Sequence, residues 1–203
     1  MLASGSPRRR ELLRDAGYRF DIIPANIDED AADPALGSAG LALWLAAEKA
    51  RAISRLHPGR LVLGADTVVA SEGHILSKPA DADDARRMLR LLGGSEHQVI
   101  TAVALVRADP PLSRSQAVSS VVRMRRLSDD EIDRYIASGL WEGKAGGYGI
   151  QDDDPFVTRT EGSHSNIVGL PMETVRMMLA EAGILPQDSS RPENGGFLPP
   201  DRA

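Results

Sequence analysis

A serine- and arginine-rich segment near the start of the chain combines several groups that bind phosphate. Ser6 suits the N-cap of a helix, Pro7 suits its first turn, and Gly17 is a plausible C-terminal stop. Free N–H groups of a first helical turn attract anions. Arg8 and Arg9 add positive charge at the same helix end, where it opposes the helix dipole and is tolerated mainly beside a bound anion. The segment therefore predicts a phosphate site, and the alternative is a capped surface helix with solvated arginines.

A single acid interrupts the most apolar predicted strand. Asp66 lies within residues 61–69 and directly follows Gly64 and Ala65, whose small size lets another segment approach the backbone. A buried carboxylate needs a metal, a cation or hydrogen-bond donors. Asp66 is therefore a candidate catalytic or metal-binding group, unless it lies at the end of the strand and caps a neighbouring loop.

Two lysines extend this set of charged residues. Lys49 lies on the apolar face of a predicted helix, and Lys78 follows a predicted hairpin. Either lysine alone is also compatible with a surface position and a buried aliphatic stem. Together with Arg8 and Arg9 they would surround Asp66 with cations. That combination suits a polyphosphate bound through a divalent metal, since cations neutralise phosphate oxygens while a carboxylate holds the metal or orients water.

Helical and strand patterns alternate along the chain, which favours an α/β domain. A capping box at Ser128 and Glu131 opens one of the helices. Predicted helices lie between residues 6 and 17 and at 38–56, 81–92, 128–139 and 171–182, and predicted strands at 61–69, 74–76, 99–106 and 117–124, with a glycine-rich loop at 143–149.

Composition narrows the class of protein. The 203 residues, 42% of them hydrophobic, can bury one substantial core in one or two lobes. No cysteine, signal peptide or long apolar run occurs, so we expect a soluble, cytoplasmic protein that does not contact a membrane. A net charge of −5 argues against non-specific binding of nucleic acid. The Pro-, Gly- and charge-rich stretch from Pro186 onward predicts a disordered tail.

Seven short motifs occur in an order that resembles the Maf (septum formation) family of nucleoside triphosphate pyrophosphatases. They are Ser4-Gly5-Ser6-Pro7-Arg8-Arg9 with Glu11-Leu12-Leu13, Glu48-Lys49-Ala50, Gly64-Ala65-Asp66-Thr67, Lys78-Pro79, His97-Gln98-Val99 with Thr101-Ala102-Val103, Gly143-Lys144-Ala145-Gly146-Gly147-Tyr148-Gly149-Ile150-Gln151, and Gly162-Ser163 with Asn166 and Val168-Gly169-Leu170-Pro171. The likeness extends from Leu2 to about Leu179.

The resemblance implies a fold and a reaction. It implies an elongated mixed sheet flanked by helices, similar to the inosine triphosphate pyrophosphatases, with residues 1–185 as one domain around a central cleft and 186–203 as a disordered tail. The protein would be a homodimer. With a divalent cation, Mg²⁺ or Mn²⁺, it would split a nucleotide between the α- and β-phosphates and release a nucleoside monophosphate and pyrophosphate.

The resemblance also assigns roles to individual residues. Asp66 matches the proton acceptor that activates water, directly or through a metal. Arg9, Lys49 and Lys78 would clamp the triphosphate, and Ser6 would donate to a phosphate oxygen. Glu29 matches an acidic position and is a second candidate metal ligand beside Asp66, although its acidic loop is also typical of a solvated surface.

Three further positions carry the marks of the branch of the family that hydrolyses dTTP and UTP. Its specificity residues are Arg, Thr and Gln, which here are Arg8, Thr67 and Gln151. A glutamine amide can pair with the O4 and N3–H edge of uracil or thymine; as a loop residue, Gln151 could equally bond only to backbone. Family members place more apolar residues before the first motif than Met1 and Leu2, so either the recorded start lies too far downstream or the first strand is short.

Two other functions use the same residues. A nucleotide-binding regulator of cell division would bind without turnover, but the presence of Asp66, Lys49 and Lys78 together favours catalysis. A phosphatase that removes the terminal phosphate would release orthophosphate instead of pyrophosphate. The chain has neither a cysteine nucleophile nor a Walker-type loop.

Overall fold

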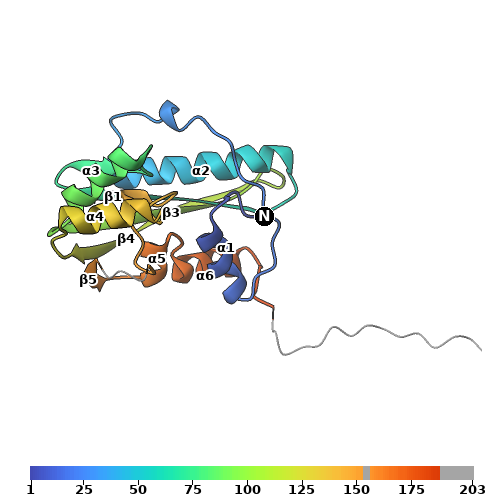
Figure 1. Cartoon of the computed structure of the whole chain (residues 1–203). Coiled ribbons are helices and arrows are strands. Elements are labelled where there is room, and N and C mark those ends of the chain that lie inside the picture. Colours follow the sequence, from blue (N-terminus) through green and yellow to red (C-terminus); the bar gives the residue numbers. More distant parts are fainter. Residues whose placement is uncertain (153–155, 188–203) are drawn as a thin grey trace, which may run out of the picture.

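A computed structural model describes residues 1–152 and 156–187, and its centre is a five-stranded antiparallel sheet (Figure 1). The strand order is β2-β1-β3-β4-β5. The strands are β1 (Val62–Ser71), β2 (His74–Leu76), β3 (Glu96–Arg107), β4 (Leu112–Met124) and β5 (Val157–Glu161). β1 and β3 are almost wholly buried and form the centre of the core.

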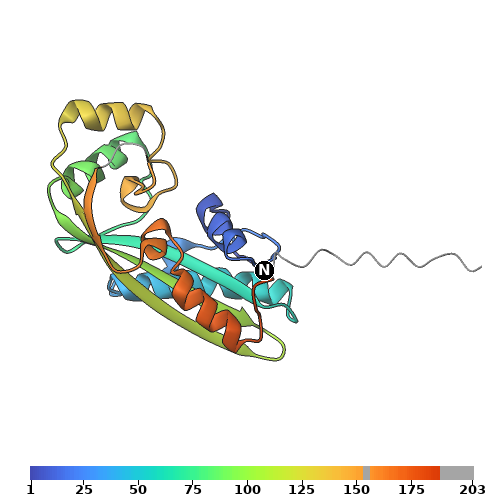
Figure 2. The ribbon, with the colours of Figure 1, turned by 90° about the horizontal axis from the view of Figure 1, so that it is seen from below.

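Helices cover the sheet on both faces and gather beyond one end. They are α1 (Pro7–Asp15), α2 (Ser38–Leu56), α3 (Ala82–Leu92), α4 (Asp129–Ala137), α5 (His164–Val168) and α6 (Met172–Glu181), with short 3-10 turns η1 (Glu29–Ala31) and η2 (Ala145–Gly147). Helix α2 lies on one face, while α1, α5 and α6 lie on the other. Helices α3 and α4 form a second lobe, visible in Figure 2, and long strands connect the two lobes.

Close packing of α2 on β1 places one of the predicted lysines. A Cβ built on Gly64 would lie 2.2 Å from the carbonyl oxygen of Ala46, so only glycine lets the helix backbone approach the strand this closely. Lys49 lies almost one helical turn after Ala46, and Asp66 lies two residues after Gly64. The small residues that precede the acid therefore bring the lysine to it.

The predicted elements are confirmed, with differences at their ends. Helix α2 has the predicted bounds, and both bonds of the capping box at Ser128 and Glu131 are present. Strand β4 begins five residues earlier than predicted, because its first part is exposed and lacks the apolar alternation that marks a strand. The named strands pair antiparallel, and among the described residues Leu2 forms isolated parallel bridges with Ile22 and Leu63.

One local expectation needs correction, and another lies mostly outside the described residues. Ser6 is the N-cap residue of α1, but its side chain makes no capping bond, and its N–H donates to Ser4 Oγ instead. The predicted tail at 186–203 lies outside the described residues except for Pro186 and Gln187, and the Gln187 N–H donates to the carbonyl of Gly17. The disordered tail stays a prediction. Within 1–152 and 156–187, no helix is long and apolar enough to cross a membrane.

Candidate active site

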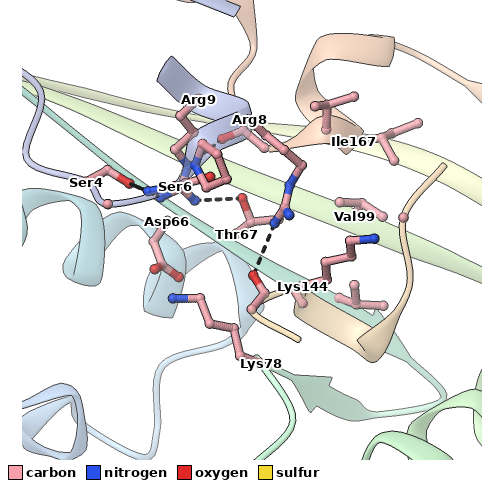
Figure 3. A pocket seen from close by; sticks show the side chains of 18 of the residues that line it. Ser4, Ser6, Arg8, Arg9, Asp66, Thr67, Lys78, Val99, Lys144 and Ile167 are labelled. Carbon is pink, nitrogen blue, oxygen red and sulfur yellow. Dashed lines mark hydrogen bonds between the residues drawn. The ribbon is translucent and has the colours of Figure 1, made fainter. Parts of the chain in front are cut away.

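A cavity of about 370 Å³ contains every residue that the sequence singled out (Figure 3). Its walls come from the start of α1, from β1 and β3, and from the loops at 142–151 and 167–169. The predicted residues that line it are Ser6, Arg8, Arg9, Glu29, Lys49, Asp66, Thr67, Lys78 and Gln151. We call the part around Asp66, Glu29, Lys49 and Lys78 the acid end, and the part around Gln151 the glutamine end.

At the acid end, one lysine lies between two carboxylates. Lys49 Nζ is 2.6 Å from Asp66 Oδ1 and 2.6 Å from Glu29 Oε1. The side chains of Lys49 and Asp66 are buried, whereas that of Glu29 is 51% exposed. Burial acts to raise the pKa of Glu29, but the hydrogen bond and charge of Lys49, helped by Lys78, outweigh it and lower the pKa. Glu29 is thus held ionised beside a fixed cation.

Lys78 supplies a second ammonium at the acid end. Figure 3 shows Lys78 and Asp66 extending into the same part of the cavity. Burial lowers the pKa of Lys78, and the nearby charges of Lys49 and Arg9 lower it further. Within the described residues no acceptor bonds its Nζ. Three cations therefore share this region with two carboxylates, and an anionic ligand would relieve their repulsion.

Most of the hydrogen-bond donors of Arg9 bond to other protein groups and are not available to a ligand. Its Nε donates to the carbonyl of Gly169 (2.8 Å), its Nη1 to the carbonyl of Ala65 (2.8 Å) and Ser4 Oγ (3.2 Å), and its Nη2 to Thr67 Oγ1 (3.1 Å). A guanidinium has five N–H donors, so one remains for a ligand. The predicted phosphate clamp is therefore also a buried brace between α1, β1 and the loop before α6.

The hydroxyl of Thr67 belongs to a directed chain of hydrogen bonds. Thr101 Oγ1 donates to the carbonyl of Asn166 (2.9 Å), and it lies 2.9 Å from Thr67 Oγ1. Since the single hydroxyl proton of Thr101 is engaged, Thr67 must donate to Thr101. Thr67 accepts from Arg9 as well. Its oxygen can therefore accept from a ligand but cannot donate to one.

Arg8 crosses the cavity from α1 to the glycine-rich loop. Its Nη2 donates to the carbonyl of Gly143 at 3.1 Å, the bond that Figure 3 draws from Arg8. Ser6 lines the same wall, and its hydroxyl is not engaged in capping α1. Arg8 thus connects the two ends of the cavity, while the Ser6 hydroxyl, which has no partner among the described residues, can donate to a ligand.

The glutamine end contains a buried ion pair that sequence reasoning did not single out. Lys144 Nζ is 2.5 and 2.6 Å from the two carboxylate oxygens of Asp152, and the Tyr135 hydroxyl donates to Asp152 at 2.5 Å. The side chains of Lys144 and Asp152 are 9% and 6% exposed. Lys144 falls inside one of the seven motifs. No spacing rule, however, links it to Asp152 or to Tyr135 in the sequence. An acid immediately after Gln151 was the available signal.

Apolar groups and a buried histidine complete the glutamine end. The apolar wall consists of Val69, Val99, Ala145, Ile150 and Ile167. Behind it, His97 Nε2 lies 2.6 Å from the Tyr148 hydroxyl and attaches the glycine-rich loop to β3. Burial lowers the pKa of His97 to about 4, so the imidazole is neutral at pH 7.

Comparison with known proteins assigns this cavity to a family. The model of the family described as Maf-like protein matches residues 1–182. The chain belongs to the Maf family. It is 50% identical over 186 residues to a protein of Cereibacter sphaeroides, covering 91% of this chain and 95% of the relative, and 47% identical over 188 residues to one of Hahella chejuensis, covering 91% and 92%. Both relatives are named dTTP/UTP pyrophosphatase.

The Maf-family match spans the whole cavity. All the residues that line it fall between Ala3 and Gly169, inside the matched range. A third relative, from Novosphingobium aromaticivorans, is 45% identical over 188 residues, covers 91% of this chain and 92% of its own length, and carries the same name. The α/β architecture predicted from the resemblance to the Maf family is confirmed.

Proposed function

We propose that this protein hydrolyses dTTP and UTP to the nucleoside monophosphate and pyrophosphate. One observation carries the proposal: Asp66, Lys49 and Lys78 line one end of a cavity whose other end presents Gln151 and an apolar wall. A triphosphate and a pyrimidine base need these two environments, joined in one cavity. The Maf-family membership and the names of relatives up to 50% identical support the same reaction.

The acid end suits the triphosphate. Lys49, Lys78 and the remaining N–H of Arg9 would neutralise the non-bridging oxygens, and Ser6 would donate to another oxygen. These groups would also stabilise the negative charge that develops on the leaving pyrophosphate. Arg8 lies between this end and the base and would contact the nucleotide near its middle.

Asp66 is the proposed general base. A water beside it would give its proton to Asp66 and attack the α-phosphorus, the bond from that phosphorus to the bridging oxygen would break, and pyrophosphate would leave with the electron pair. Lys49 holds Asp66 Oδ1 at 2.6 Å, which leaves Oδ2 to accept the proton. Because the carboxylate is buried and bonded, its orientation is fixed before the substrate arrives.

A divalent metal fits the same acids. Mg²⁺ in nucleotide enzymes uses one or two carboxylates together with phosphate oxygens and water. Asp66 and Glu29 both bond to Lys49 Nζ at 2.6 Å, so the two carboxylates are near enough to each other to hold one metal between them. Within the described residues there is no cluster of three or more acidic or histidine side chains, so phosphates and water would supply the remaining ligands. When bound, Mg²⁺ or Mn²⁺ would polarise the phosphates and neutralise the leaving group.

The glutamine end would select the base. The Gln151 carbonyl can accept from N3–H and its amide can donate to O4, a pattern that uracil and thymine offer and cytosine does not. A site whose polar groups are left unpaired by the wrong base discriminates strongly. Thr67, which can only accept, and Arg8 would complete the specificity set.

The decisive experiment is a nucleotide panel assayed with Mg²⁺ and with Mn²⁺ for both products. We expect dTTP and UTP to give equimolar monophosphate and pyrophosphate and to exceed ATP, GTP, CTP and 7-methyl-GTP. Release of orthophosphate would contradict the proposed bond cleavage, and binding without turnover would favour a nucleotide-binding regulator of cell division. The homodimer and the cytoplasmic location are part of the proposal, and light scattering after size exclusion tests the first.

A further inference from the structure

Lysine is rare in this chain, and every lysine lines the same cavity. The sequence has 24 Lys and Arg residues together, but its lysines are only Lys49, Lys78 and Lys144. Everywhere else the positive charge is an arginine. A compact ammonium and a planar guanidinium are not interchangeable, since the ammonium presents its donors to a single point. Lys49 and Lys78 belong to the acid end, which leaves Lys144 at the glutamine end without a role.

Lys144 is rigidly held with one donor to spare. The two oxygens of Asp152 engage two of its three N–H groups, and within the described residues no other acceptor bonds it. Asp152 is fixed in turn by the Tyr135 hydroxyl. Burial and, after it, the bond to Asp152 raise the pKa of Tyr135, which keeps it a donor. The remaining N–H of Lys144 therefore has a defined position at the wall of the cavity.

The ammonium and the Gln151 amide meet at one place. A Cβ built on Gly149 would lie 2.9 Å from Gln151 Nε2, 2.9 Å from Lys144 Nζ and 3.0 Å from Asp152 Oδ1, the oxygen that bonds Lys144. Two nitrogen donors thus flank the same glycine, in a cavity that also has an apolar wall. Neighbouring donors suit a ligand oxygen with two lone pairs, which is the carbonyl oxygen of a base.

We propose that Lys144 is a further specificity-determining residue, which together with the Gln151 amide binds the carbonyl oxygen at position 4 of uracil or thymine, and that Asp152 and Tyr135 are its positioning residues. This inference rests on the proposed function. Cytosine carries an amino group at position 4, which would oppose the ammonium donor to donor. The charge on Lys144 therefore adds a penalty against cytosine that a neutral amide alone does not provide.

The test compares UTP with 4-thio-UTP, which keeps N3–H, O2, the ribose and the triphosphate but replaces O4 with a weaker acceptor. We expect Lys144→Met to lower kcat/KM for UTP by about 10- to 100-fold and to change the value for 4-thio-UTP far less. The loss should appear in KM, because the bond to O4 is equal in the ground and transition states. Equal losses on the two substrates would overturn the inference.

Removing one partner of a buried ion pair can unfold its surroundings. The double variant Lys144→Met/Asp152→Asn therefore removes both charges and should show the same selective loss. Tyr135→Phe keeps the ion pair and should narrow the preference for UTP over 4-thio-UTP by a smaller factor, with kcat retained. A fall in kcat with an unchanged preference would assign Tyr135 a merely structural role and contradict its positioning role.

Inhibition by inorganic tripolyphosphate serves as the matched control, since this ligand has no base. We expect the same inhibition constant in the wild type and in all three variants. If the wild type releases no pyrophosphate from UTP, the proposed function fails and the inference falls with it. If the wild type turns over UTP while the variants lose both substrates equally, the inference alone is overturned.

Discussion

The two ends of the cavity use the same pair of groups, a lysine and a carboxylate, in different surroundings. At the acid end, Lys49 is shared by Asp66 and by Glu29, whose side chain is 51% exposed. At the glutamine end, Lys144 has a single carboxylate partner, both side chains are at least 90% buried, and a tyrosine fixes the acid. The first arrangement can exchange a partner for a phosphate or a metal, whereas the second is rigid. Proton transfer needs the former, and discrimination between bases needs the latter.

The largest effect should come from the buried acid of the first pair. We expect Asp66→Asn to lower kcat by on the order of a hundredfold or more, because the variant keeps the shape but cannot accept a proton. Pyrophosphate release under saturating dTTP measures it, and circular dichroism checks the fold. Asp30→Asn is the matched control: it changes an exposed acid of the loop that carries Glu29, outside the cavity lining, and should leave kcat unchanged. Near wild-type kcat in Asp66→Asn would remove this residue from the mechanism.

A change at the glutamine end should affect the base and spare the phosphates. Gln151→Leu is expected to lower kcat/KM for dTTP and UTP by roughly 10- to 100-fold, since the polar edge of the base is left unpaired. Inhibition by pyrophosphate should remain as in the wild type. Weaker inhibition by pyrophosphate in this variant would show that the two ends are not separable.

Most of the acid end could be predicted from sequence, because its residues stand out locally. An acid inside an apolar strand and a lysine on an apolar helical face are both exceptions to a periodic pattern, and Gly64 explains how they meet. Most element bounds were predictable for the same reason, but β3 and β4 begin earlier than predicted, and β5 and α5 were not predicted. Local patterns therefore sufficed wherever a residue departed from its own neighbours.

The brace around Arg9 and the Lys144 pair could not be predicted in this way. Arg9 bonds to carbonyl groups of Ala65 and Gly169, which every residue type possesses, so side-chain identity gives no signal. Lys144 and Asp152 lie in a loop, where no period relates sequence spacing to direction. Only the folded backbone shows that Lys144 has a partner and Arg9 has little capacity left for a ligand.

Lowering the pH should reduce the stability of the folded protein through His97, which lies at the glutamine end. Burial lowers the pKa of His97 in the folded protein to about 4, below the usual 6.5. Below pH 6.5 the unfolded chain therefore binds more protons than the folded one. The free energy of unfolding falls as the pH decreases through this range. The loss should reach about 2 kcal/mol at pH 5 relative to neutral pH. Urea unfolding at both pH values measures it. His97→Gln should remove this part of the pH dependence, and an unchanged slope in that variant would assign it to other groups.

The smallest effect should come from Gly149→Ala, which crowds the glutamine end without changing its charge. Gly149→Ala adds one methyl group where Gln151 Nε2 and Lys144 Nζ would each lie 2.9 Å from it, so both donors must shift by a few tenths of an ångström. We expect several-fold lower kcat/KM for UTP, an unchanged kcat and an unchanged inhibition constant for tripolyphosphate, measured in the same assay. Gly37→Ala is the control, because a Cβ at Gly37 would meet open space. Gly143→Ala would not serve, because the φ of +66° at Gly143 would add backbone strain.

The brace at Arg9 also sets the order in which the protein can become functional. Its Nε bond spans 160 residues of sequence, from the first helix to the carbonyl of Gly169. A nascent chain that has not yet reached this glycine can pair Ala3 with Leu63 of β1 but cannot complete the brace at Arg9. A ribosome-bound chain arrested before residue 169 should therefore contain most of the sheet without a nucleotide site. Assembly of the cavity is a late event in synthesis, although the segment that begins it is made first.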